Sequence, residues 1–210
     1  FHHETLPNAV AVAVSGGSDS MALTLLLKVW CQLNDVRLIA LTVDHALRTE
    51  AAAEARLVGR WLLDHKIEHH ILTRTGAKPA TGMQAFARDA RYELMAGACQ
   101  QFEVEFLFVG HQAEDQLETF VLRLSKGSSL AGLGSMSILS DREGLKIVRP
   151  LLPYRRKELR EYLISEKQDW IEDPSNENPQ FTRTELGRVV TAISQLPGSS
   201  FEAISLSLNR

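Results

Sequence analysis

The chain has 210 residues, 44% of them hydrophobic and 23% charged, with 23 basic against 26 acidic residues and a net charge of −3. This composition excludes a disordered or collagen-like chain, and the length is enough for one full domain with a buried core. The longest uncharged apolar run, Met21 to Leu27, is far shorter than the roughly 20 residues of a bilayer-spanning helix, so no membrane association is expected.

Short apolar strands alternate with helical patterns along most of the chain. In chain order, the pattern predicts a strand at 9–14, a helix at 19–33, a strand at 37–43, a helix at 50–65, a strand at 68–72, a helix at 82–101, a strand at 106–109, a helix at 112–124 and a strand at 145–148. Strands that alternate with helices are typical of a parallel sheet. The expected fold class is therefore α/β, with a doubly wound parallel sheet.

The sequence after this alternating region has a different character. The charged amphipathic tract 154–166 predicts one more helix, the turn-rich stretch 173–179 interrupts the pattern, and appended helices are expected beyond it. We therefore divide the chain into a domain at 1–153 and a helical appendage at 154–210. Because the chain begins with phenylalanine and ends without an obvious terminal cap, we also expect it to be a fragment of a longer protein.

Two cysteines, Cys31 and Cys99, lie far apart in the sequence and form no Cys-x-x-Cys pair. Neither a disulfide framework nor an iron–sulfur or zinc site is expected from them. The cysteine content therefore predicts a reducing compartment, the cytoplasm.

The hexapeptide Ser15–Ser20 (SGGSDS) lies directly between the first predicted strand and the first predicted helix. Glycine lets a backbone approach an anion closely, and the first amides of a helix attract negative charge. This position favours a phosphate-binding turn, whereas a lone Ser-Gly-Gly would indicate a simple helix cap. The endings of a Walker A loop and of a Rossmann fingerprint are both missing, which argues against an ordinary P-loop kinase or a dehydrogenase.

The carboxylate of Asp19 lies within this turn, where it would repel a phosphate unless it binds a metal ion or the amides of the loop. The hexapeptide resembles the SGGxDS loop of the ATP pyrophosphatase (PP-loop) superfamily, whose members cleave ATP into AMP and pyrophosphate. The resemblance implies Mg²⁺ at Asp19. It also implies that ATP is bound by the loop residues Ser15, Gly16, Gly17, Ser18, Asp19 and Ser20.

Further segments resemble one family of that superfamily, the tRNA(Ile)-lysidine synthetases. Residues 43–48 (VDHALR) are similar to its VDHGLR segment, and residues 110–119 (GHQAEDQLET) to its GHHxDDQxET segment. Matches continue in order at 127–136, 149–152 and 173–176. The chain departs from the family pattern at Ala46, Gln112 and Glu114, and more strongly at 181–188, where the family usually has Arg-Asn-x-(Ile/Leu)-Arg.

This resemblance implies a cytoplasmic ligase with two substrates besides ATP. The enzyme would adenylate the wobble cytidine of tRNA(Ile) with a CAU anticodon, and free L-lysine would then displace AMP. The implied fold for 1–153 is that of a PP-loop, adenine nucleotide alpha hydrolase-like catalytic domain, with 154–210 leading towards a C-terminal tRNA-binding region. A homodimer is considered as its oligomeric state.

Candidate site residues follow the second and fourth predicted strands. Asp44 ends the second strand, at the edge where open parallel sheets bind ligands, and is a candidate for adenosine or metal contact; the alternative is a cap of the next turn. His111, Asp115 and Glu118 have an i, i+4, i+7 spacing and are expected to share one helical face. The resemblance favours catalytic roles for these three and Mg²⁺ binding by Asp115, over a solvated helix start.

Basic residues complete the candidate catalytic set. Arg88 lies three residues before Arg91 in a predicted helix, so both can reach one RNA phosphate or the adenylate; the alternative is a surface pair bound to nearby carboxylates. Lys126, at the start of the Gly/Ser-rich segment, is expected to neutralise charge on the pyrophosphate.

The segment from Arg142 to Arg160 carries seven basic residues and two glutamates within a chain whose net charge is negative. Such a segment suits a polyanion such as tRNA, and the alternative is a solvated helix face.

Two other functions stay open from the sequence. A tRNA thiolase of the same superfamily would share the loop, but such enzymes generally work through cysteines. A non-catalytic ATP-binding module would keep the loop without needing the basic segment or the polar residues from His111 to Glu118.

Overall fold

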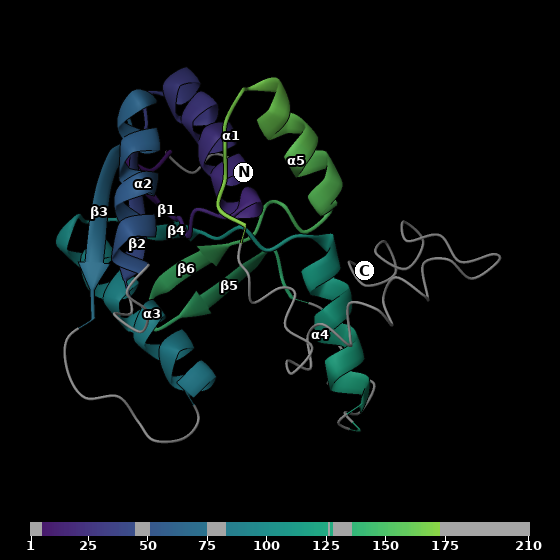
Figure 1. The fold of residues 1–210 in the computed structure, drawn as a ribbon. Coiled ribbons are helices and arrows are strands. Elements are labelled where there is room, and N and C mark those ends of the chain that lie inside the picture. The colour runs from purple at the N-terminus through teal and green to yellow at the C-terminus, as the bar shows by residue number, and fades with distance from the viewer. Residues whose placement is uncertain (1–5, 45–50, 75–82, 126, 128–135, 173–210) are drawn as a thin grey trace.

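The computed structural model describes residues 6–44, 51–74, 83–125, 127 and 136–172. Within them, six strands form one sheet in the order β3-β2-β1-β4-β6-β5 (Figure 1). The strands are β1 (Ala9–Ala13), β2 (Arg37–Asp44), β3 (Glu68–Thr73), β4 (Phe106–Phe108), β5 (Leu139–Arg142) and β6 (Leu145–Val148). All neighbouring pairs are parallel except β5 and β6. The predicted α/β fold is confirmed.

The edge strand β5 is a feature that the residue pattern does not predict. Its sequence, LSDR, has no apolar run, and it forms because Glu143 and Gly144, both at positive φ, reverse the chain. The Asp141 carboxylate accepts a hydrogen bond from the amide of Gly144 at 3.0 Å and closes this turn. The expected parallel sheet therefore gains one antiparallel edge strand.

The described helices lie close to their predicted positions. They are α1 (Ser18–Asn34), α2 (Ala51–Asp64), α3 (Met83–Gln101), α4 (Ala113–Ser125) and α5 (Arg156–Ser165). In Figure 1, α1, α2 and α5 cover one face of the sheet and α3 covers the other. No helix in the described ranges combines the length and the apolar character needed to cross a membrane.

The core consists of two main clusters, one on each face of the sheet. Alternate residues of a strand point to opposite faces, so Val12 packs with α1, α2 and α5, whereas its neighbour Ala11 packs with α3. Leu159 and Leu163 of α5 belong to the first cluster together with Met21 of α1. Residues beyond 153 are therefore packed on the sheet domain as far as α5, and the boundary between 153 and 154 stays a prediction.

The strand order places β1 at the centre of the sheet, between β2 and β4. The chain leaves β1 towards one edge through β2 and β3, and later returns to the other side of β1 as β4. Such a switch point opens a crevice at the carboxyl ends of the two strands, where α/β sheets bind ligands. The segments that follow β1 and β4 therefore meet there, and they are Ser15–Ser20 and the turn before α4.

Candidate functional site

The Ser15–Ser20 loop is closed by its own hydroxyl groups. Ser20 Oγ accepts a hydrogen bond from the Ser15 amide at 3.2 Å and donates one to the Gly17 carbonyl at 3.0 Å. Ser15 Oγ lies 3.1 Å from Ser20 Oγ and accepts a hydrogen bond from the Gly17 amide at 3.5 Å. These bonds are internal, so Ser15 and Ser20 hold the shape of the loop, and their binding of ATP stays a prediction.

Glycine is required at position 16 by both conformation and space. Gly16 has φ +90°, and a Cβ there would lie 2.7 Å from Val58 Cγ2 and 2.8 Å from Ile171 Cδ1. The Gly16 carbonyl also accepts a hydrogen bond from the Ile171 amide at 2.9 Å, so the segment after α5 fixes the loop. The loop is therefore held from α2 on one side and from residue 171 on the other.

The start of α1 keeps its first amides available. Gly17 occupies the N-cap position in an extended conformation. Because glycine has no side chain, no side-chain atom of it can accept a hydrogen bond from the first amides of the helix. The first amides of a helix have no partner within the helix, and the helix dipole places partial positive charge there. This end of α1 is therefore suited to an anion, as the sequence predicts.

Gly110 brings the turn after β4 against the start of α1. A Cβ at Gly110 would lie 3.1 Å from backbone atoms of Asp19 and Ser20. Backbone atoms cannot move aside as a flexible side chain does, so a glycine is needed for this close approach. The 110–119 segment and the Ser15–Ser20 loop therefore form one site.

The helix α4 begins at Ala113, so His111 lies in the turn before it. The expected shared helical face therefore includes Asp115 and Glu118 but not His111. The Asp115 carboxylate accepts a hydrogen bond from the Gln112 amide at 3.0 Å, and the fully buried Gln112 side chain accepts one from the Glu114 amide. Asp115 and Gln112 thus cap this helix start, and the catalytic roles of His111, Asp115 and Glu118 stay predictions.

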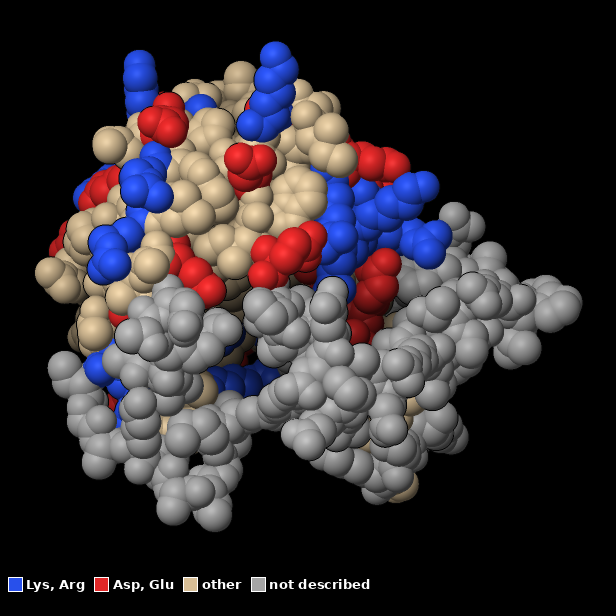
Figure 2. Space-filling model, viewed as in Figure 1, with Lys and Arg blue, Asp and Glu red and all other residues tan. Residues whose placement is uncertain are grey.

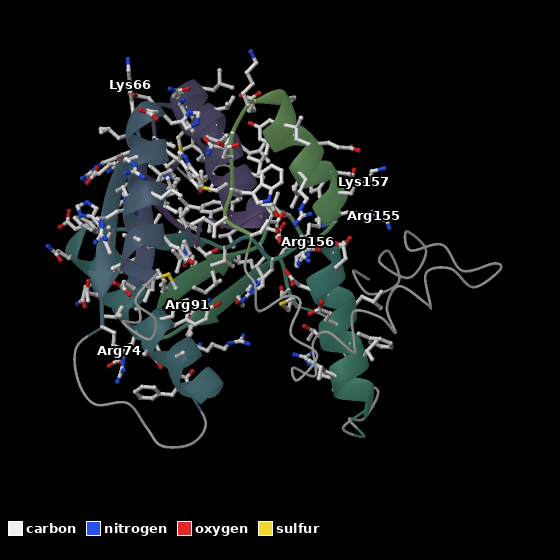
Figure 3. The ribbon with its side chains drawn as sticks, in the orientation of Figure 1. Lys66, Arg74, Arg91, Arg155, Arg156 and Lys157 are labelled. Carbon is white, nitrogen blue, oxygen red and sulfur yellow. The ribbon has the colours of Figure 1, made fainter. Side chains whose placement is uncertain are left out.

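Arg156, at the first position of α5, joins the loop to α4 (Figure 3). Its Nε lies 3.3 Å from the carboxylate of Asp19, and its amide donates a hydrogen bond to Glu114 at 3.1 Å. Burial is the largest single influence on the Arg156 pKa and lowers it, but the nearby charges of Asp19, Asp115 and Glu114 outweigh it and raise the pKa. One guanidinium therefore stands among three carboxylates next to the proposed phosphate site.

The sequence includes Arg156 only as one of several residues in a basic segment. Its role is not visible there, because Asp19 and Arg156 are separated by most of the chain and meet only when α5 packs on α1. The sequence offers one indication of a role for Arg156, which is its position shortly after segment 149–152, a segment that resembles the family pattern.

The other predicted site residues lie in different environments. Asp44 is buried at the end of β2, where its carbonyl accepts a hydrogen bond from the Arg74 amide at 2.9 Å. Arg88 and Arg91 are exposed on α3, the layer on the opposite face from α1. Lys126 lies outside the described residues. The structure thus brings Asp19 and Asp115 together around Arg156, and it gives no contact between Arg88 and this group within the described ranges.

The basic segment 142–160 is divided between two parts of the fold, and its suitability for a polyanion stays a prediction. Arg142 pairs with Asp89 at 3.0 Å and Lys146 with Glu105 at 3.6 Å, both on the β5–β6 hairpin at the sheet edge. The start of α5 holds a separate group, Arg155, Arg156 and Lys157, which Figures 2 and 3 show beside acidic side chains. Residues close in sequence are separated here because a strand, a turn and a helix carry them to different places.

The two cysteines are both free, buried and in separate clusters, Cys31 on α1 and Cys99 on α3. Burial raises the pKa of each thiol to about 11. No group of three or more His, Cys, Asp or Glu side chains suited to a metal ion occurs among the residues that the structure describes.

We expect both thiols to stay unmodified when the native protein is treated with a thiol reagent at neutral pH. The reactive form is the thiolate, and burial keeps these groups protonated and out of contact with the reagent. Colorimetric titration with a disulfide reagent should detect about two thiols only after denaturation. Rapid reaction of one thiol in the folded protein would contradict this.

A family model described as a PP-loop domain matches residues 1–193. The chain belongs to the PP-loop family. Curated relatives of this PP-loop protein include the tRNA(Ile)-lysidine synthase of Hyphomonas neptunium, which is 44% identical over 191 residues, 88% of this chain and 51% of the relative. The tRNA(Ile)-lysidine synthase of Rhodopseudomonas palustris is 40% identical over 200 residues, 94% of this chain and 57% of the relative. The chain thus spans about half the length of the curated relatives that it matches.

Solved structures share the fold of this PP-loop domain. The U34-tRNA thiolase NcsA from Methanococcus maripaludis, with its [4Fe-4S] cluster, superposes with a TM-score of 0.81 at 17% identity, covering 97% of this chain and 72% of that one. An NMN synthetase from Francisella tularensis gives a TM-score of 0.53 at 13% identity, covering 96% of this chain and 84% of that one. At these identities the likeness concerns the fold alone.

Proposed function

We propose that this PP-loop domain is the catalytic part of an ATP-dependent ligase that modifies tRNA(Ile). The ligase adenylates the wobble cytidine of the CAU anticodon, and free L-lysine then replaces AMP. The observation that carries this proposal is the start of α1, whose first amides suit an anion, at the switch point of the sheet, where Gly110 lets the 110–119 segment come close to it. Relatives named tRNA(Ile)-lysidine synthase, at 38–44% identity, support the choice of substrates.

In the first step, the triphosphate of ATP lies at the first amides of α1. The cytosine carbonyl oxygen attacks the α-phosphorus, a phosphorus–oxygen bond forms, and pyrophosphate leaves with the electrons of the bond that breaks. No protein nucleophile is needed, so the contribution of the chain is to position and to stabilise charge. Arg156 serves this step by offsetting the negative charge of Asp19, Glu114 and Asp115, which would otherwise repel the phosphates.

Among the described residues, Asp19 is the one best suited to bind Mg²⁺. Magnesium is bound in nucleotide sites by one or two carboxylates together with phosphate oxygens and water. The Asp19 side chain lies at the start of α1, with Ser18 Oγ donating a hydrogen bond to it at 3.0 Å. Asp115, the other predicted ligand, caps the Gln112 amide at the start of α4 and does not lie at the start of α1. Bound Mg²⁺ would neutralise charge on the leaving pyrophosphate.

In the second step, the ε-amine of lysine attacks the activated ring carbon and AMP leaves. The amine must lose a proton to form the new carbon–nitrogen bond, so a carboxylate near it is needed as acceptor. Asp115 and Glu118 lie three residues apart on α4, next to the site, and we propose that they orient the ammonium group and accept its proton.

Replacing both Asp115 and Glu118 by their amides is expected to slow lysine transfer by about a hundredfold, because the proton acceptor is lost. ATP–pyrophosphate exchange in the presence of tRNA should continue, since the first step does not need that acceptor. The measurement is AMP release with and without lysine. As a control, Glu161→Gln on α5 removes an exposed carboxylate and should change neither reaction. Unaltered lysine transfer in the double variant would remove these residues from the mechanism.

The proposed function is tested by incubating the chain with ATP, Mg²⁺, lysine and a tRNA(Ile) transcript carrying the CAU anticodon. We expect stoichiometric AMP release and a mass increase of the anticodon fragment by one lysyl group. A transcript with a different first anticodon base should give neither. Binding of ATP without pyrophosphate exchange would instead support the non-catalytic ATP-binding module.

The thiolase alternative finds less support in the residues. Sulfur transfer by this class generally uses cysteines close to the nucleotide site. Cys31 and Cys99 are buried in different clusters of the core, and their raised pKa values keep both thiols protonated. The ligase is therefore the reaction that suits this chain better.

A further inference from the structure

The peptide unit between Val14 and Ser15 carries the chain from β1 into the nucleotide loop, and both of its polar groups are held. The hydroxyl of Thr42, a buried residue of β2, donates a hydrogen bond to the Val14 carbonyl at 2.8 Å. The amide on the other side of the same peptide, that of Ser15, donates to Ser20 Oγ at 3.2 Å. The plane of this peptide is therefore fixed from β2 and from α1 at once.

The Thr42 hydroxyl also contacts a histidine, and this contact is consistent with the direction of its hydrogen bond to Val14. His69 Nε2, on β3, lies 2.8 Å from Thr42 Oγ1. A threonine hydroxyl has one proton, and here it goes to Val14, so Oγ1 must accept a hydrogen bond from Nε2–H. This assigns the Nε2–H tautomer to His69.

The ring of His69 is itself held in place. A Cβ at Gly59 of α2 would lie 3.1 Å from its Nδ1, so α2 packs closely against the ring. Burial, with a smaller contribution from His70, lowers the pKa of His69 to about 4, and the ring is therefore neutral at neutral pH. A chain of hydrogen bonds thus runs from His69 through Thr42 to the first peptide of the loop.

We propose that Thr42 and His69 are positioning residues of the nucleotide site, which act by fixing the Val14–Ser15 peptide. Neither lies in the Ser15–Ser20 loop. If that peptide plane rotated, the Ser15–Ser20 bond would break and the amides of the loop would no longer converge on one phosphate. Donors that are already in position favour binding, because less free energy is lost in ordering them when the ligand binds. The inference rests on the proposed function to the extent that the ligand is ATP.

Two substitutions at position 42 separate this role from simple packing. Thr42→Val keeps the shape of the side chain and removes the hydroxyl, whereas Thr42→Ser keeps the hydroxyl. We expect Thr42→Val to weaken binding of Mg-ATP about tenfold, as the loss of a buried hydrogen bond allows, and Thr42→Ser to remain within about twofold of the wild type. The dissociation constant is measured by calorimetry on the full chain, with thermal unfolding recorded in parallel.

A purely structural role predicts a different result. Thr42→Val would then lower the unfolding temperature and leave the ATP affinity of the folded protein unchanged. That result, or equal weakening by Thr42→Ser, would overturn the inference.

A second pair of variants applies even if Thr42→Val fails to fold. His69→Phe removes the donor to Thr42 and should weaken Mg-ATP binding about threefold to fivefold. His70→Gln alters the neighbouring histidine, which bonds to Glu68 and faces Phe102, and should leave affinity unchanged. Wild-type affinity in His69→Phe would overturn the inference.

The readout also separates this inference from the proposed function. A wild-type chain that binds ATP but forms no lysidine overturns the function and leaves the positioning role standing. A wild-type chain that binds no ATP overturns both.

Discussion

Replacing Arg156 by glutamine should weaken binding of Mg-ATP by about thirtyfold. Arg156 is the cation among Asp19, Glu114 and Asp115, and its loss leaves their negative charge facing the triphosphate. Two unit charges about 4 Å apart near a protein surface interact by about 4 kcal/mol, and partial exposure of Arg156 reduces this to about 2 kcal/mol, or about thirtyfold in affinity. Calorimetric titration with Mg-ATP measures the effect.

The neighbouring Lys157 is the matched control for Arg156. It lies on the same helix and carries the same charge, but it is exposed and pairs only loosely with Glu161, at 3.7 Å. Lys157→Gln should therefore change ATP affinity less than twofold, since exposed pairs contribute little.

A double variant tests whether the neighbouring carboxylates are the reason for this loss. Adding Glu114→Gln to Arg156→Gln removes part of the uncompensated charge without touching the Mg²⁺ ligand proposed above, and should recover part of the lost affinity, so the two effects should be non-additive. Equal loss of affinity in Arg156→Gln and Lys157→Gln would show that only general positive charge matters.

Replacing Gly16 by alanine should both destabilise the fold and abolish measurable ATP binding. At φ +90° a side chain costs about 1–2 kcal/mol, and the contacts of 2.7 Å with Val58 and 2.8 Å with Ile171 add about 1–3 kcal/mol of overpacking. In a domain of this size, each kcal/mol lowers the unfolding temperature by about 2–4 °C. We therefore expect a decrease of about 5–15 °C, measured by differential scanning calorimetry.

Gly144 provides the control for backbone strain alone. It has a similar φ of +86°, but a Cβ there meets nothing within 4 Å, and it lies in the β5–β6 turn. Gly144→Ala should therefore cost only the conformational part and leave ATP binding intact. A Gly16→Ala variant no less stable than Gly144→Ala would mean that α2 and residue 171 do not restrict the loop.

Local patterns determine much of the fold, because hydrophobic periodicity and turn residues act over short distances. The strand at 9–14, the helix after it and the loop between them are visible in sequence and lie where expected. The strand β5 is not visible, since its pairing with β6 comes from a turn with positive φ at Glu143 and Gly144 rather than from apolar residues. The helix α4 begins at Ala113, one residue after its predicted start, because Asp115 and Gln112 cap it there, and His111 therefore lies outside the helical face that was expected to include it.

The sequence by itself determined the α/β class, the position of the Ser15–Ser20 loop at the start of the first helix and the candidate residues of segment 110–119. Each of these depends on neighbours in the chain, through strand and helix periodicity and the fixed dipole of a helix end. Only the tertiary structure decided that Arg156 joins Asp19, that Thr42 holds the first peptide of the loop, and that the basic segment divides between a sheet edge and a helix start. These contacts join residues far apart in the chain, and they exist only after α5 and β2 have packed beside β1 and α1.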